Sequence, residues 1–378
     1  MKAVWKEARV GAVLKLEYGK PLNDRDRRPD GLYPVYGANG VKDRTNKFYF
    51  DKQTIIVGRK GSAGELNLTE SKFWPLDITY FVTFDEQQYN LRFIYYLLTT
   101  LDLPRLAKGV KPGINRNEVY SQNIKVPPLS EQKRIIAILD ESFEGITTAK
   151  TNAEKNLQNA SALFESYLHS VFTQRSEGRV EKTLGDVCQF ENGDRGKNYP
   201  NRNEYVESGI PWINTGHIQP DGTLSKTEMN FISREKYNSL RSGKIQPGDL
   251  VYCLRGATLG KTALVDPFTI GAVASSLVII RPCDLLDCYF LYYFLTSSLG
   301  QGFIKLYANG AAQPNLGAQS VAKYTISLPK LADQKVIVKK IAVLAAETQR
   351  LESIYQKKIS DLEELKKSVL QKAFNGKL

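Results

Sequence analysis

The segment RGATLGKT, residues 255–262, comes nearest to a phosphate-binding motif in this sequence. A nucleotide-binding P-loop needs four residues between its first glycine and the Gly-Lys pair, because the backbone N–H groups of that turn surround a phosphate. Here three residues separate Gly256 from Gly260, and the related segment KGSAGEL has Glu65 near the place of the lysine. Two compatible interpretations remain: a tight β turn, and a glycine loop through which Lys60 and Arg255 face a nucleic-acid phosphate or a guanine edge.

Other residue types that support catalysis are sparse. The chain has only two histidines, His169 in a helical pattern and His217 alone in a loop, and without a carboxylate or thiol partner neither is expected to act as a general base. Its four cysteines form no Cys-x-x-Cys pair, which argues against a zinc site or a disulfide framework. The acidic and basic residues Glu131 and Lys133 are interpreted as a helix-start feature, not as a nuclease metal site. We therefore predict no catalytic residue, no metal site and no cofactor.

Composition and charge favour a folded, basic protein. The chain has 378 residues, 42% hydrophobic residues and a formal net charge of +12, which suits a polyanionic partner such as nucleic acid. The positive excess occurs in residues 1–129, 179–330 and 331–378, so it does not belong to a single basic tail. No apolar leader or run long enough to span a membrane is present, and we expect a reducing, cytoplasmic location with no membrane partner.

The most specific signal is an internal repeat. LSEQKRIIAILDESFE at Leu129 aligns without a gap with LADQKVIVKKIAVLAAE at Leu331, an offset of 202 residues, and the same offset still aligns ESYLHSVF with KSVLQKAF. Upstream, IYYLLT matches LYYFLT, RKGSAG matches LRGATLG, and YPVYGANG matches IPWINTGHI, all in the same order. So many collinear matches indicate a tandem duplication.

Each copy ends in a long helical pattern, at 131–172 and 333–374, where proline is absent. Apolar residues alternate in steps of three and four, which is typical of a coiled coil, and two such stripes in one chain predict an antiparallel pair of about 60 Å. Two helices that each pack on their own domain are the alternative. The predicted pairing residues are Leu139, Phe143, Ile146, Leu157 and Phe164 in the first helix, and Ile337, Ile341, Leu344, Leu351, Tyr355, Leu362 and Leu365 in the second.

The globular segments mix short β-type runs (TIIVG, ITYFVTF, LVYCL, SLVII) with one apolar helix each, which predicts α+β domains of matching topology. Their loops carry side chains suited to phosphates and base edges, notably KGVKPGINRNEV and its match ANGAAQPNLGAQSV. These residues are also common in solvated loops that bind nothing. The candidates for DNA contact are Lys20, Tyr36, Asn39, Lys60, Ser62, Lys111, Asn115 and Arg116 in the first half, and Arg195, Lys197, Asn214, Arg255, Thr258, Lys261, Gln313 and Asn315 in the second.

Together these features resemble one family, the specificity subunits of type I restriction-modification systems. The resemblance covers essentially the whole chain and depends on the helix entries PPLSEQKRI and PKLADQKVI, the helix ends LFESYLHSVF and LKKSVLQKAFNGKL, and the openings VLKLEYGKPL and YPVYGANG. The second entry departs from the family pattern, because Ala332 and Asp333 replace a more usual acidic EQK run.

The resemblance implies two target-recognition domains, 1–129 and 179–330, and two helical spacers, 130–178 and 331–378, related by a pseudo-twofold axis. Each recognition domain would bind half of a bipartite, asymmetric double-stranded DNA site. It also implies two modification subunits that methylate adenine with S-adenosylmethionine, and a translocating restriction subunit, so that S-adenosylmethionine, ATP and Mg²⁺ belong to partners. Two rivals remain: a coiled-coil scaffold that does not recognise DNA, and a fused restriction-methylation enzyme, for which the methyl-donor and adenine-binding motifs are missing.

Overall fold

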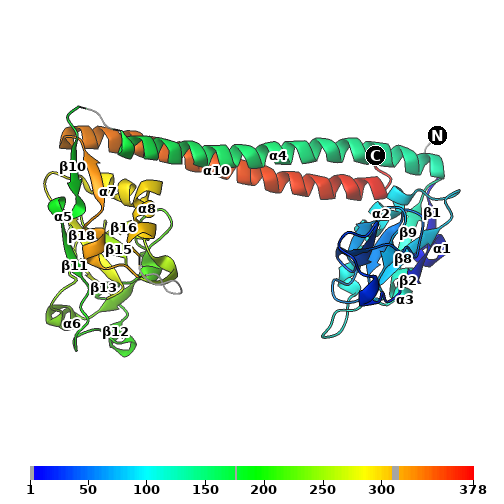
Figure 1. Cartoon of the computed structure of the whole chain (residues 1–378), viewed down its shortest axis with the longest axis horizontal. Helices are drawn as coiled ribbons and strands as arrows, with labels where there is room; N and C mark the ends of the chain where they lie inside the picture. Colours follow the sequence, from blue (N-terminus) through cyan, green and yellow to red (C-terminus); the bar gives the residue numbers. More distant parts are fainter. Residues whose placement is uncertain (1–3, 175–176, 309–314) are drawn as a thin grey trace. The chain divides into compact units, whose positions relative to one another are not determined.

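The computed structural model describes residues 4–174, 177–308 and 315–378. The chain divides into two compact units, Met1–Glu154 with Lys357–Leu378, and Lys155–Gln356. Each unit combines three small sheets and short helices with one part of each long helix (Figure 1). The domain boundaries predicted from the sequence remain predictions.

The first unit contains a four-stranded antiparallel sheet in the order β2-β8-β5-β6, a three-stranded sheet in the order β4-β3-β7, and the pair β1-β9. The four-stranded sheet comprises β2 (Leu14–Tyr18), β8 (Thr79–Phe84), β5 (Ile55–Gly58) and β6 (Leu66–Leu68). The others comprise β4 (Gly40–Thr45), β3 (Tyr33–Gly37), β7 (Trp74–Pro75), β1 (Lys6–Arg9) and β9 (Asn123–Val126). The α-helices are α1 (Val10–Val13), α2 (Leu91–Thr100) and α3 (Arg116–Tyr120), and Asp24–Asp26 and Leu103–Leu106 form 3-10 turns.

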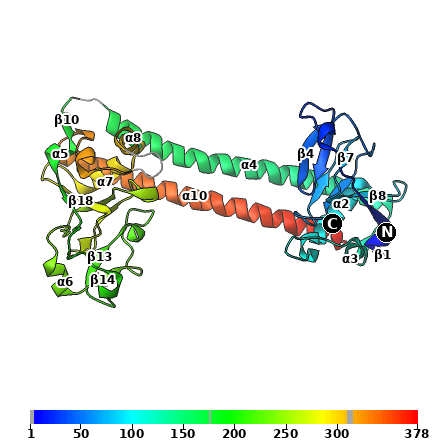
Figure 2. The same cartoon turned by 60° about the horizontal axis from the view of Figure 1, so that its bottom comes forward.

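The second unit repeats this arrangement with sheets β11-β18-β15-β16, β12-β14-β13-β17 and β10-β19; β13 and β14 lie beside α6 in Figure 2. The strands are β11 (Cys188–Asn192), β18 (Leu277–Pro282), β15 (Leu250–Cys253), β16 (Thr262–Leu264), β12 (Tyr205–Val206), β14 (Asn230–Ile232), β13 (Ile210–Ile213), β17 (Ala272–Val273), β10 (Val180–Thr183) and β19 (Thr325–Leu328). The helices are α5 (Leu184–Val187), α6 (Arg234–Ser239), α7 (Cys288–Thr296), α8 (Ser298–Tyr307) and α9 (Ala318–Val321), with 3-10 turns at Arg202–Glu204, Thr215–His217 and Gly256–Thr258.

Strand pairing confirms that the two units share one topology. In both, the sheet that contains β3 or β13 includes a parallel pair, β3 with β7 and β13 with β17. The apolar helix predicted in the second half is α7, and it ends at Thr296. Ser297 breaks it there and caps α8, with its hydroxyl accepting the N–H of Gly300.

The long helices α4 (Leu129–Thr173) and α10 (Leu331–Phe374) pack against each other in both units. In the first unit, Lys366 lies over the ring of Phe143 and Lys150 pairs with Glu363, so the two helices are antiparallel there. In the second, the Ser161 hydroxyl donates to Glu352. The 202-residue offset relates this contact to the Lys150–Glu363 pair, because it aligns Lys150 with Glu352 and Ser161 with Glu363.

Most of the predicted pairing residues are buried or half-buried, but two are not. Leu351 is 40% exposed and Leu365 is 48% exposed. Glu352, one residue after Leu351, is half-buried, and Lys366, one residue after Leu365, is exposed but lies over the Phe143 ring. The apolar pattern therefore predicted the wrong residues at these two positions, because part of the interface between α4 and α10 is polar. Glu352 accepts a hydrogen bond from Ser161, and Lys366 lies over the ring of Phe143.

The start of each long helix is joined to the unit in which it begins by one buried glutamine. The Gln132 side chain accepts the N–H of Asn90 at 2.9 Å and donates to the carbonyls of Gln88 and Pro127 at 3.1 and 3.0 Å. Gln334 is its counterpart in the second unit. It accepts the N–H of Asp287 at 2.8 Å and donates to the carbonyls of Leu285 and Pro329, both at 2.9 Å.

Asn90 and Asp287 are the N-caps of α2 and α7. Both glutamines are at most 1% exposed. They therefore join the start of each long helix to the start of the apolar helix that it packs against. In the entry motif, the structural residue is this glutamine and not the flanking acidic and basic pair.

Candidate nucleic-acid interface

The two loops predicted separately in the first half lie side by side. The glycine loop, residues 59–64, follows β5, and residues 108–115 precede α3. The N–H of Gly61 donates to the Pro112 carbonyl at 2.9 Å, and the N–H of Ile114 donates to the Arg59 carbonyl at 3.0 Å. Two segments that are distant in sequence therefore form one surface, on which Lys60 and Lys111 are both exposed.

The second unit brings its matching loops together in the same way. The N–H of Leu316 donates to the Leu254 carbonyl at 2.9 Å, and Arg255 forms a β-bridge with Asn315. The side chains of Arg255 and Asn315 are exposed. Gln313 lies outside the described residues. The loop pairing is thus a property of the duplicated fold and not of one half.

Other predicted contact residues differ in how accessible they are. Lys20, Asn39, Arg195, Lys197 and Lys261 are exposed, whereas Ser62 and Thr258 are half-buried. Some already have partners. The ammonium of Lys20 lies 4.8 Å from the ring centroid of Tyr49, and Arg195 donates to the Ser275 carbonyl at 3.3 Å. These contacts leave the cations at the surface, where phosphate contact requires them.

Tyr36 is a correction, because the structure places it in the core. It is 5% exposed, its ring lies edge-on to Phe73, and its hydroxyl accepts the N–H of Glu70. Burial raises the pKa of Tyr36 above its ordinary value. Strand β3 is buried along most of its length, so the YPVYGANG motif contributes to the core at this position, and only its turn residue Asn39 is exposed.

Two predicted asparagines are helix caps. Asn115 caps α3 by accepting the N–H of Asn117 at 2.9 Å, and Asn214 caps a 3-10 turn by accepting the N–H of Gly216 at 2.8 Å. Capping uses the side-chain carbonyl oxygen, so what remains to face a base is the amide NH₂. Helix capping alone explains why asparagine occurs at these two positions. Their contact with DNA remains a prediction.

At the end of β2 the first unit carries a cluster that sequence analysis missed in part. Tyr18 is 46% exposed, and the guanidinium carbons of Arg59 and Arg116 lie 5.4 and 5.0 Å from its ring centroid. Tyr80 packs edge-on beneath it at 5.0 Å, and burial raises the pKa of Tyr80 to about 12. Only Arg116 was predicted. Tyr18 ends β2 and Arg59 follows β5, and β8 lies between these two strands in the sheet. Sequence spacing does not express this proximity.

At the end of β11 the second unit has an open cavity of ≈ 550 Å³. It is lined by Asn192, Gly193, Asp194, Arg195, Arg241, Ser242, Leu254, Arg255, Asn315, Leu316, Gly317 and Ala318. Predicted residues from three separate loops, Arg195, Arg255 and Asn315, therefore meet here. Arg241 and Asp194 were not predicted, because 47 residues separate them and neither belongs to a repeated motif.

Asp194 organises this cavity. Its side chain is 1% exposed, and it accepts the guanidinium of Arg241 at 3.0 Å, the N–H of Arg241 at 2.9 Å and the N–H of Gly196 at 2.8 Å. The bond from the Arg241 side chain, with the two backbone donors, holds the pKa of Asp194 well below its usual range. The carboxylate is therefore charged at any neutral pH.

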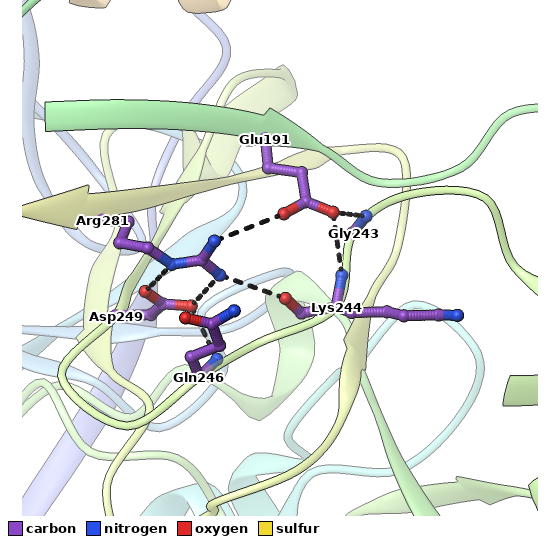
Figure 3. Close-up of polar contacts among 6 residues, drawn as sticks. All are labelled: Glu191, Gly243, Lys244, Gln246, Asp249 and Arg281. Atoms are coloured by element: carbon purple, nitrogen blue, oxygen red, sulfur yellow. Dashed lines mark hydrogen bonds and ion pairs between the residues drawn. The ribbon is translucent and has the colours of Figure 1, made fainter. Parts of the chain in front are cut away.

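A second network holds the segment 243–249 beside this cavity (Figure 3). Arg281 donates through two nitrogens to Asp249, both at 2.8 Å, and also to the Lys244 carbonyl at 3.2 Å. Glu191 lies 3.7 Å from Arg281 and accepts the N–H of Gly243 at 2.6 Å. Because Asp249 is fully buried, this ion pair fixes the backbone that follows Arg241.

Groups suited to catalysis or metal binding do not gather in the described parts of the chain. No cluster of three or more His, Cys, Asp or Glu side chains that could hold a metal occurs there. His217 is 4% exposed, and its Nδ1 accepts the N–H of Asn214 at 3.1 Å. Burial lowers the pKa of His217. No described helix is long and apolar enough to cross a membrane.

A family model, the type I restriction modification DNA specificity domain, matches residues 3–158 and again residues 177–360. The chain belongs to this family. The resemblance drawn from the two helix entries is thereby confirmed, and the two matched ranges agree with the internal repeat.

Full-length relatives support the assignment. A putative type I restriction enzyme specificity subunit of Haemophilus influenzae is 26% identical over 348 residues, which cover 88% of this chain and 85% of the relative. A type I restriction enzyme specificity subunit of Methanocaldococcus jannaschii is 23% identical, over 99% of this chain and 93% of the relative.

Solved structures show the same fold. A chain from work on complex assembly and conformational transition of the type I R-M system matches with a TM-score of 0.78 at 18% identity, covering 100% of both chains. The HsdS subunit from Thermoanaerobacter tengcongensis matches with a TM-score of 0.60 at 18% identity, covering 99% of this chain and 97% of that one. The predicted α+β fold with two similar domains and two long helices is confirmed.

Proposed function

We propose that this chain is the DNA-specificity subunit of a type I restriction-modification complex. Each recognition domain binds one half of a bipartite double-stranded DNA site. The observation that carries the proposal is the repeated loop pair: a glycine loop bonded to a second loop, with exposed cations, built twice on one frame. Family membership supports the same conclusion.

Different half-sites follow from the different clusters on that frame. The first unit presents two guanidiniums on a tyrosine ring, whereas the second presents a guanidinium fixed to a buried carboxylate beside an open cavity. Donors at different positions match different base edges. The recognised site is therefore asymmetric.

Chemistry belongs to the partners in this proposal. Two modification subunits methylate adenine and a restriction subunit translocates DNA, and S-adenosylmethionine, ATP and Mg²⁺ bind to those partners. The chain itself has no catalytic role. The long helices hold the modification subunits, and the large apolar side chains that they expose, such as Leu163 at 65% and Val343 at 66%, support contact with protein there.

The test is DNA binding by the full chain assembled with a modification subunit. We expect a discontinuous site with a fixed gap in electrophoretic shifts, and replacing residues 1–129 by those of a relative should change one half of the site only. Replacing Lys60, Lys111, Arg116 and Arg255 by alanine should weaken binding, with base preference altered only by residues at base edges. Unchanged binding would support a scaffold without DNA recognition, and methyl transfer by this chain alone would support a fused enzyme.

A further inference from the structure

The guanidinium of Arg241 is held in one orientation at the surface. Its Nη2 donates to Asp194 Oδ1 at 3.0 Å, and the backbone N–H of the same residue donates to Asp194 Oδ2 at 2.9 Å. The carboxylate is 1% exposed, whereas the Arg241 side chain is 70% exposed. One end of the side chain is therefore anchored in the protein while most of its surface faces the cavity.

Gly196 forms the floor under this guanidinium. A Cβ at residue 196 would lie 2.1 Å from Nη2 of Arg241 and 2.9 Å from its Cζ, so any larger residue would displace the group. On the other side, Gly243 approaches Gly193 closely, and a Cβ there would lie 2.8 Å from the Gly193 Cα. The two glycines let the segment that carries Arg241 lie directly against the loop that carries Asp194.

An anchored arginine is suited to a particular target. An arginine that contacts a phosphate helps to position the protein on the duplex but carries no sequence information, so it need not face one base edge. A guanine edge instead offers two acceptors, O6 and N7, in fixed positions, and a planar guanidinium meets them only when its orientation is set. Because Arg241 has one nitrogen on Asp194, its other donors are restricted to a known direction.

We propose that Arg241 recognises a guanine in the half-site bound by the second recognition domain, and that Asp194 is its positioning residue. This inference rests on the proposed function. It adds a base-specific role for a residue outside the loops singled out from the sequence, and it separates Arg241 from its neighbour Arg195, which is exposed and donates weakly to a backbone carbonyl.

The experiment uses the full chain assembled with its modification subunits and a DNA library in which both half-sites are randomised. The wild-type complex should select one G·C pair in the second half-site that Arg241→Ala no longer selects, with discrimination falling by about 5- to 150-fold. All other positions should keep their preference. Arg195→Ala is the matched control, because it makes the same change in a neighbouring arginine and should leave every preference in place.

Positioning is tested while Arg241 is retained. Gly196→Ala should displace the guanidinium and Asp194→Asn should weaken its anchor, so both should reduce selection of the same G·C pair while the first half-site is selected as before. Overall affinity alone would not separate positioning from folding, whereas loss at one base pair does. Gly196→Ala also guards against misfolding of the Asp194 variant, since it keeps the buried carboxylate: its added methyl group would lie nearest the Arg241 guanidinium, with Asp194 Oδ1 at 3.2 Å.

An atomic probe completes the test. Replacing the selected guanine by 7-deazaguanine removes the N7 acceptor, which should weaken binding of the wild-type complex and have no effect on Arg241→Ala. If Arg241→Ala keeps the guanine preference, or if it weakens binding to all sequences equally, Arg241 does not recognise the guanine and the inference is wrong. If the wild-type complex selects no bipartite site, the proposed function fails instead.

Discussion

At the end of β2 the first unit presents Tyr18, followed by Gly19 and Lys20, whereas at the end of the equivalent strand β11 the second unit presents Asn192, followed by Gly193 and Asp194. An aromatic ring orients arginines in one unit, and a buried carboxylate orients an arginine in the other. The glycine between them is retained in both. Duplication therefore kept the backbone of the site while the side chains that face a ligand changed.

The long helices show the opposite behaviour. Gln132 and Gln334 make the same three types of backbone contact. The ring of Phe374 packs on Phe93 in the first unit as Phe172 packs on Phe290 in the second, with centroids 5.0 and 5.1 Å apart. The contacts that join the long helices to the domains are shared by both units, whereas the side-chain contacts at the loop surface differ. Two domains that bind different half-sites can therefore keep the same backbone framework.

The largest difference in stability between the units is expected from the buried Arg281–Asp249 ion pair of the second unit. Strand alignment places Thr83 and Thr54 at these positions in the first unit. Arg281→Met leaves a fully buried carboxylate without its cation, which should cost about 3–5 kcal/mol of unfolding free energy. Hydrogen exchange should show the loss in α7 amides, with α2 amides as the internal control. Equal loss in both units would contradict the assignment of this network to the second unit.

The shared frame predicts paired effects. Gln132→Met and Gln334→Met each leave three backbone groups without their side-chain partner, and each unpaired buried group costs about 1–3 kcal/mol. We expect exchange protection to fall in α2 for the first variant and in α7 for the second, by similar amounts. A large effect in one unit and none in the other would show that the two glutamines are not equivalent.

Sequence patterns predicted the repeat, the long helices, the apolar helices and the two candidate loops of each half, because each depends on periodicity or on repeated motifs, but they did not predict that the loops pair. They failed where the deciding contact joins residues without a motif. Asp194 and Arg241 meet only through the fold, Tyr36 turns inward on a buried strand, and the polar seam position Glu352 does not appear in an apolar pattern. Whether the exposed cations contact phosphate remains a prediction.

The Tyr18 cluster tests whether the first unit orients its arginines by the ring alone. Tyr18→Ala should reduce preference in the first half-site, with a loss of about 0.5–2 kcal/mol per stacked guanidinium. Tyr18→Phe keeps the ring and should keep the preference. Selection from a DNA library with a randomised first half-site measures the base preference of both variants. If Tyr18→Phe also loses the preference, the Tyr18 hydroxyl and not the ring is responsible for it.

Acid stability should also distinguish the units. Burial lowers the pKa of His217, so near pH 6.5 the unfolded chain protonates this imidazole more readily than the folded second unit does. The second unit should therefore lose stability as pH falls below about 6.5, the ordinary histidine pKa. His217→Gln should flatten this dependence between pH 7 and 5 in denaturant melts, and the exposed His169→Gln should not.

The smallest effect is expected at the related contacts between the long helices. Lys150 is half-buried and Glu363 is exposed, so water and salt compete with their ion pair. Lys150→Ala should leave the unfolding midpoint unchanged, as should Glu352→Ala at the aligned position. A measurable loss in either variant would show that these polar contacts, and not the apolar seam, set the pairing of the helices.

The division of the chain has a consequence for how the protein is made. The second unit is one continuous stretch, but the first is completed by residues 357–378, and Ala373 is fully buried in its core. A ribosome releases the start of the first unit long before the helix end that closes it. The first unit therefore begins synthesis first but completes its core after the second unit. Its apolar surface around Phe93 stays uncovered until the last turns of α10 have been synthesised.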